Sequence, residues 1–133
     1  MANHKTKIIV ADDEQVIANS LAAILKQAGF DARAVYSGEM AVEMARDFQP
    51  DKLISDVFMS GITGIEAAVQ VRIMLPSCQI LLFSGQAQTM DLTEGEFDVL
   101  CKPIDPADLL ARLRTRTDIN MHGAKQTECE NRI

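Results

Sequence analysis

The sequence predicts an α/β fold, a doubly wound domain built on a five-stranded parallel sheet. Short apolar runs, typical of strands that are buried on both faces, alternate along the chain with longer segments whose apolar residues recur at helical spacing. Strands and helices that alternate in this way form parallel βαβ units. The 133 residues are enough for one domain with a substantial core.

Five segments are expected to be strands. "KIIVA" and "KLISDV" carry consecutive apolar residues, "QILLF" is almost wholly apolar, and "DARAV" and "VLC" are weaker. The expected strands are residues 7–11, 31–35, 52–57, 79–83 and 99–101.

The helices lie between and after these strands, and most have recognisable caps or stops. A capping serine or aspartate, a terminal glycine and several prolines mark their ends. The expected helices are one from Glu14 that Gly29 stops, one capped by Ser37 and ended by Pro50, one over Ile65 to Leu75 before Pro76, and one opened by Asp105 and Pro106.

The segment between the last two strands, residues 85–98, is short for the two loops and one helix that it must contain. It shows little apolar periodicity and includes Gly95. We therefore expect a fourth helix that is short, irregular or absent.

Composition narrows the class of protein. The net charge of −6 argues against nonspecific nucleic-acid binding and against binding to an anionic membrane surface, and no apolar stretch is long enough to span a membrane. Three widely spaced cysteines without a CxxC pair favour reduced thiols. These features predict a cytoplasmic protein. From about Asp118 the chain turns polar and loses its apolar periodicity, which predicts a polar tail over 118–133.

Polar residues gather where the predicted strands end. Ligands of open parallel sheets bind outside the carboxyl ends of the strands. The residues at these ends are Asp12 and Asp13 after the first strand, Asp56 at the third, Ser84 after the fourth, and Lys102 followed by Pro103 after the fifth. Three carboxylates, a hydroxyl and an ammonium are therefore expected at one edge.

Each of these residues alone has an ordinary explanation. Acids after a strand are often helix caps, and a lone serine or lysine is often a turn or surface residue. Asp56 is harder to explain in this way, because it lies in an apolar run and needs a partner that offsets its desolvation. As a set, the carboxylates suit Mg²⁺, a carboxylate can accept a phosphoryl group, and Lys102 can neutralise the oxygens of that group.

Four motifs resemble the receiver domains of two-component response regulators: "IIVADDE", "LISDVFMSGITG", "ILLFSG" and "LCKP". The resemblance covers a receiver domain over residues 6–117 and implies a flavodoxin-like fold with strand order 2-1-3-4-5. It implies that Asp56 is the phosphoacceptor and that Asp12, Asp13, Asp56 and the backbone carbonyl of Phe58 hold Mg²⁺, with Asp13 as the more direct ligand of the acidic pair. Ser84 resembles the family's switch hydroxyl, and Lys102, followed by Pro103, resembles its phosphate-binding lysine.

The chain departs from the family pattern at three places. Ser60 follows Met59 where the family commonly has proline, and Val99 stands where it often has an aromatic ring. The third departure is the short 85–98 segment.

The polar tail is too short for a DNA-binding or catalytic domain, so we expect a stand-alone receiver without direct DNA binding. The resemblance implies that it takes its phosphoryl group from a sensor histidine kinase or a histidine phosphotransfer protein and acts on a downstream protein. It would catalyse only its own phosphorylation and dephosphorylation, so we do not expect an enzyme in the ordinary sense. One alternative is a receiver-shaped interaction module that acts without phosphorylation. Another is a phosphatase with an aspartyl-phosphate intermediate, which ranks last because Phe58 occupies the position of its second acidic residue.

Overall fold

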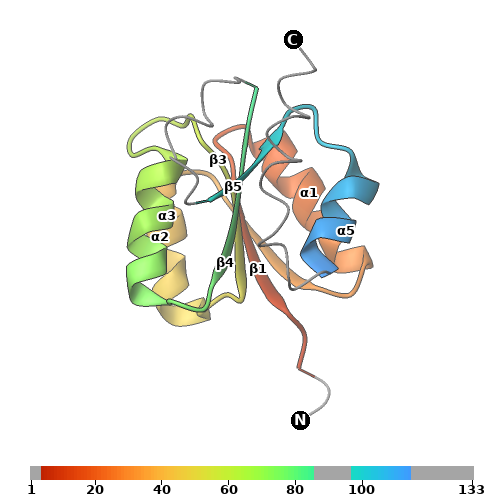
Figure 1. The fold of residues 1–133 in the computed structure, drawn as a ribbon, viewed down its shortest axis with the longest axis horizontal. Coiled ribbons are helices and arrows are strands. Elements are labelled where there is room, and N and C mark those ends of the chain that lie inside the picture. The colour runs from red at the N-terminus through yellow and green to blue at the C-terminus, as the bar shows by residue number, and fades with distance from the viewer. Residues whose placement is uncertain (1–3, 86–96, 115–133) are drawn as a thin grey trace.

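The computed structural model describes residues 4–85 and 97–114, which form one parallel sheet between two layers of helices (Figure 1). The strands lie side by side in the order β2-β1-β3-β4-β5, all parallel, which confirms the predicted topology. The elements are β1 (Lys7–Ala11), α1 (Gln15–Gln27), β2 (Asp31–Val35), α2 (Gly38–Phe48), β3 (Lys52–Asp56), α3 (Gly64–Met74), β4 (Gln79–Ser84), β5 (Asp98–Cys101) and α5 (Pro106–Arg114).

The two layers enclose two separate apolar cores. In Figure 1, α2 and α3 cover one face of the sheet, and α1 and α5 cover the other. Alternation along each strand sends side chains to both faces: Ile9 of β1 packs in the α2–α3 core and Ile8 in the α1–α5 core, and both are fully buried. The central strands therefore have little freedom to slide, since a shift by one residue would exchange the two faces.

Local signals fix the helix ends close to the predicted positions. The Ser37 hydroxyl accepts a hydrogen bond from the Met40 N–H, and the Asp105 carboxylate accepts one from the Ala107 N–H, so both predicted caps are confirmed. Helix α3 begins at Gly64, one residue earlier than predicted, because Thr63 and Glu66 form a capping box. β3 ends at Asp56, one residue before the predicted end.

The expected fourth helix and the polar tail lie outside the described residues.

Of the cysteines, Cys78 is a buried free thiol, and burial raises its pKa to about 11. Cys101 is disulfide-bonded, so the expectation of reduced thiols is wrong for this residue, and a count of cysteines could not reveal it. Among the described residues, no helix is long and apolar enough to cross a membrane.

Candidate functional site

The carboxyl ends of four neighbouring strands bring the predicted site residues together. Asp56 is the last residue of β3 and Ser84 the last of β4, while Asp12 follows β1 and Lys102 follows β5. Their neighbours in the sheet hold them in register: the Lys102 N–H donates to the Ser84 carbonyl at 2.9 Å. Residues 46 positions apart, Asp56 and Lys102, thus become direct neighbours.

Asp56 is a buried carboxylate with one cationic partner. The residue is 8% exposed, and the Lys102 Nζ donates a hydrogen bond to its Oδ2 at 3.3 Å. Burial raises the pKa of Asp56, the nearby Asp12 charge adds to the rise, and Lys102 opposes it. The net direction shows that one lysine does not fully offset the loss of water around this carboxylate.

Asp12 is more deeply buried and less well paired. One carboxylate oxygen, Oδ1, accepts a hydrogen bond from the Glu14 N–H at 2.9 Å. The other, Oδ2, is buried and accepts no hydrogen bond from any residue that the structure describes; the Lys102 Nζ lies 3.8 Å from it. Burial is the largest cause of the raised pKa of Asp12, partly opposed by the Glu14 hydrogen bond and by Lys102. An orphaned, buried anionic oxygen marks a place for a cation.

Asp13 completes the acidic cluster from an exposed position. Its Oδ2 accepts long hydrogen bonds from the Ser60 N–H and hydroxyl, at 3.3 and 3.4 Å. One carboxylate oxygen each from Asp12, Asp13 and Asp56 lies within 4.8 Å of the others. Oxygen ligands from a few carboxylates, open to solvent on one side, are the donor set that Mg²⁺ prefers, so these residues fit that ion.

The remaining predicted residues surround this cluster. Ser84 is 1% exposed at the end of β4, and the Lys102 ammonium lies 5.2 Å from the centre of the Phe83 ring. Phe58, two residues beyond Asp56, is 44% exposed. Pro103 follows Lys102 through a cis peptide bond.

Val99, which replaces the aromatic residue common in the family, has an aromatic neighbour in Phe97. Val99 is buried in the α2–α3 core, and Phe97 packs in the same core, so the two residues share a face of the sheet as strand alternation requires. Phe97 carries the Arg72 guanidinium over its ring, 5.3 Å from the centre. The ring is therefore already occupied in packing.

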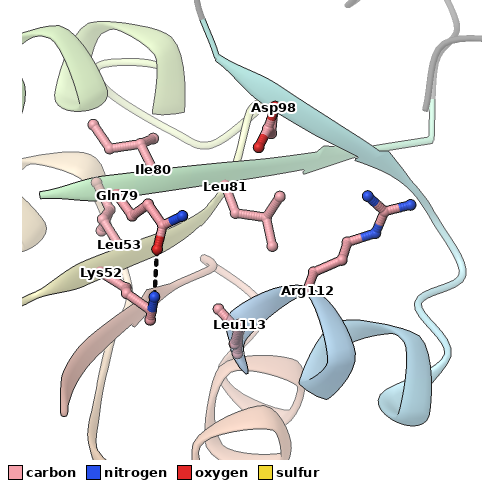
Figure 2. Close-up of a pocket in the computed structure, with 8 residues that line it drawn as sticks. All are labelled: Lys52, Leu53, Gln79, Ile80, Leu81, Asp98, Arg112 and Leu113. Atoms are coloured by element: carbon pink, nitrogen blue, oxygen red, sulfur yellow. Dashed lines mark hydrogen bonds between the residues drawn. The ribbon is translucent and has the colours of Figure 1, made fainter. Parts of the chain in front are cut away.

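A small concave feature lies at the end of the strands opposite to the acidic cluster and is too small for a ligand. Figure 2 shows it between the first residues of β3, β4 and β5 (Lys52, Gln79 and Asp98) and Arg112 and Leu113 of α5. The Lys52 ammonium donates to the Gln79 side chain across it. Its volume of about 20 Å³ has room for roughly one water molecule.

Sequence reasoning identified every member of the acidic cluster but missed the residues that hold the neighbouring loop. Ser60 was noted only for the missing proline, and it donates to Asp13. Glu39 was not singled out at all, and its carboxylate accepts a hydrogen bond from the Ile62 N–H at 3.1 Å. No sequence signal links α2 to that loop, because the contact depends on how the two elements pack.

Comparisons with known proteins agree with this geometry. Residues 8–114 match the family model described as the response regulator receiver domain. The response regulator MtrA of Mycolicibacterium smegmatis, described as DNA-binding, is 29% identical over 120 residues, which cover 87% of this chain and 52% of MtrA. The transcriptional regulatory protein CreB of Escherichia coli is 32% identical over 110 residues, covering 80% of this chain and 48% of CreB. The chain thus spans about half the length of these relatives.

Solved structures show the same fold. The chemotaxis protein CheY4 of Vibrio cholerae superposes with a TM-score of 0.76 at 27% identity, over 84% of this chain and 98% of CheY4. A response regulator receiver protein from Sinorhizobium medicae gives a TM-score of 0.73 at 28% identity, over 81% of this chain and 90% of that one. The family resemblance drawn from the four motifs is confirmed.

Proposed function

The chain belongs to the receiver domains of response regulators, and we propose that it is a signalling switch that accepts a phosphoryl group on Asp56 in a Mg²⁺-dependent reaction. The observation that carries the proposal is the environment of Asp56: a buried carboxylate at the end of a central strand, 3.3 Å from the Lys102 ammonium and beside Asp12 and Asp13.

In the proposed reaction, an oxygen of Asp56 attacks the phosphorus atom of the donor. The new bond joins this oxygen to phosphorus, and the bond between phosphorus and the donor's histidine nitrogen breaks. Lys102 is placed to bind an oxygen of the transferred group, and the Ser84 hydroxyl can donate to another. Burial raises the pKa of Asp56, which makes its carboxylate a more basic nucleophile than an exposed one.

Asp12, Asp13, Asp56 and the carbonyl of Phe58 would hold the Mg²⁺ ion. The ion supplies positive charge that neutralises the phosphoryl oxygens as they approach the carboxylates. The orphaned Asp12 Oδ2 supports this assignment, because a cation is the partner that this buried oxygen needs.

Receiver domains are phosphorylated by histidine kinases or phosphotransfer proteins, and they catalyse their own phosphorylation and dephosphorylation. We propose such a donor for this chain, together with a downstream protein target. The net charge of −6 argues against direct DNA contact by this domain and against an anionic membrane surface.

Phosphorylation by a small-molecule donor tests the proposal. The wild-type protein is incubated with acetyl phosphate and Mg²⁺, and its intact mass is measured. We expect one added phosphoryl group, which is lost in Asp56→Asn and in excess chelator. Asp47→Asn, at an exposed aspartate of α2, is the matched control and should label like the wild type.

A label that survives Asp56→Asn would show that the acceptor is wrong. A wild type that binds Mg²⁺ but takes no label from acetyl phosphate or a phosphorylated donor would favour the alternative, an interaction module that acts without phosphorylation. The short segment over 85–98 and the valine at position 99 are what keep that alternative open.

A further inference from the structure

The loop that follows Asp56, residues 57–63, carries the Phe58 carbonyl and is held at several points. The Gly64 N–H donates to the Val57 carbonyl at 2.7 Å and closes the loop. Ser60 donates to Asp13, but the distances of 3.3 and 3.4 Å are long for hydrogen bonds to a carboxylate. Asp13 is also a proposed metal ligand, so metal binding would disturb its hydrogen bonds with Ser60.

A second contact that restrains this loop comes from helix α2. Glu39, in the first turn of that helix, accepts a hydrogen bond from the Ile62 N–H at 3.1 Å. Its carboxylate lies directly against Gly61, where an added Cβ would be 2.5 and 2.8 Å from the two carboxylate oxygens. Gly61 also has a φ of +81°, a left-handed conformation. The left-handed φ favours glycine at this position, and the short distances show that the Glu39 carboxylate packs against the backbone of the loop.

Apolar packing reinforces the same contact. A Cβ on Gly38 would be 2.7 Å from Cγ1 of Ile62, so the start of α2 and the loop fit closely together. Ile62 is partly buried against the α2–α3 core. The carboxylate of Glu39 is in addition favoured at the positive end of the α2 dipole. The first turn of α2 is thus a fixed support for residues 61 and 62.

We infer that Glu39 is a positioning residue for the phosphorylation site: by holding the loop at Gly61 and Ile62, it keeps the Phe58 carbonyl in place for Mg²⁺. The inference rests on the proposed function. Glu39 is not a member of the acidic cluster, so its hydrogen bond to Ile62 persists when Asp13 turns to the ion. Without Glu39, the loop would have to be ordered each time the metal binds, which weakens binding.

Hydrogen exchange of the metal-free protein tests the contact itself. In Glu39→Ala, the Ile62 amide should exchange about 3- to 10-fold faster than in the wild type, the effect of losing one hydrogen bond. Glu39→Gln keeps an acceptor oxygen and should restore most of the protection. Glu43→Ala, one turn further along α2 at an exposed position, is the matched control and should leave Ile62 unchanged.

Calorimetric titration with Mg²⁺ then tests the consequence. Glu39→Ala should bind Mg²⁺ about 3- to 10-fold more weakly, with Glu39→Gln closer to the wild type. With acetyl phosphate, the Mg²⁺ concentration that gives half the maximal labelling rate should rise by the same factor. The labelling rate at saturating Mg²⁺ should stay within about twofold of the wild type, because a positioning contact acts on metal binding rather than on the attack itself.

The inference is wrong if Glu39→Ala leaves either Ile62 exchange or Mg²⁺ affinity at the wild-type value, or if Glu43→Ala has an equal effect. Failure of the proposed function gives a different pattern. A wild type that takes no label on Asp56 refutes phosphorylation there, while exchange and calorimetry still decide the role of Glu39.

Discussion

Replacing Asp56 by asparagine is expected to stabilise the metal-free protein at neutral pH, even though the change removes an ion pair. The pKa of Asp56 is raised because burial and the Asp12 charge outweigh Lys102. An acid whose pKa is higher in the folded than in the unfolded state costs more to ionise in the folded protein. Above the raised pKa, the charge on Asp56 therefore opposes folding.

Distances within the cluster set the size of the effect. With an effective dielectric constant of about 20, Lys102 at 3.3 Å attracts Asp56 by roughly 5 kcal/mol, and Asp12 within 4.8 Å repels it by at least about 3.5 kcal/mol. These contributions largely cancel, so the lost hydration of the carboxylate decides the sign. A buried polar group that is poorly paired typically costs about 1 to 3 kcal/mol, so we expect a gain of about 1 to 2 kcal/mol and a rise of about 3 to 8 °C in Tm.

Urea and thermal unfolding in a chelator, followed by circular dichroism, measure this difference. The gain should be largest at neutral pH and should shrink as pH falls through the raised pKa of Asp56, because the wild-type carboxyl then becomes neutral in the folded state. Below the ordinary carboxyl pKa of about 3.9, the gain should vanish. Asp47→Asn, which makes the same change of net charge on the surface, should stay within about 0.5 kcal/mol of the wild type.

Adding Mg²⁺ should reverse the order of stability, since the ion stabilises the folded wild type in proportion to its binding and binds the variant more weakly. The reasoning fails if Asp56→Asn is less stable than the wild type in chelator at pH 7. It also fails if the difference between the two proteins does not change with pH.

Two further predictions concern the phosphorylated state. Replacing Phe58, a half-exposed residue two positions beyond Asp56, by asparagine should shorten the lifetime of the phosphoryl group, because a bulky apolar ring there would obstruct the approach of water. Phe58→Leu keeps much of the bulk and should decay close to the wild-type rate. Equal decay of all three proteins would contradict steric shielding. With a beryllofluoride mimic of the aspartyl phosphate, hydrogen exchange should slow mainly in residues 85–98. Val99 has no ring that could change rotamer, so we expect the conformational change to occur in that segment instead. An indifferent 85–98 segment, with a response in α5 instead, would contradict that route.

The acidic cluster could be predicted from the sequence because it depends on regular geometry. Once β1, β3, β4 and β5 are recognised as parallel neighbours, their carboxyl ends must meet at one edge, whatever the exact bounds of each strand. The sequence therefore predicts that Asp56 and Lys102 lie close to each other, and the distance of 3.3 Å between the Lys102 Nζ and the Asp56 Oδ2 agrees.

The contacts that support the cluster could not be predicted in the same way. Glu39 accepts the hydrogen bond from Ile62 because the first turn of α2 packs against the loop after β3. Neither apolar periodicity nor a cap signal predicts where two such elements pack against each other. The start of α3 is different, since the Thr63–Glu66 capping box was readable in the sequence and was overlooked. The disulfide of Cys101 depends on spatial proximity, which composition does not contain.

The burial of Asp12 and Asp56 also explains why so much apolar structure surrounds so small a site. Two carboxylates with raised pKa values oppose folding at neutral pH, and one lysine is shared between them. They stay in place because β1, which Asp12 follows, and β3, whose last residue is Asp56, are buried over most of their length, and their side chains fill the cores on both faces of the sheet. A cation at the cluster, or a phosphoryl group that draws Lys102 to itself, changes this balance of charge directly. The site is thus a place where binding alters the free energy of the fold, which is the property that a switch requires.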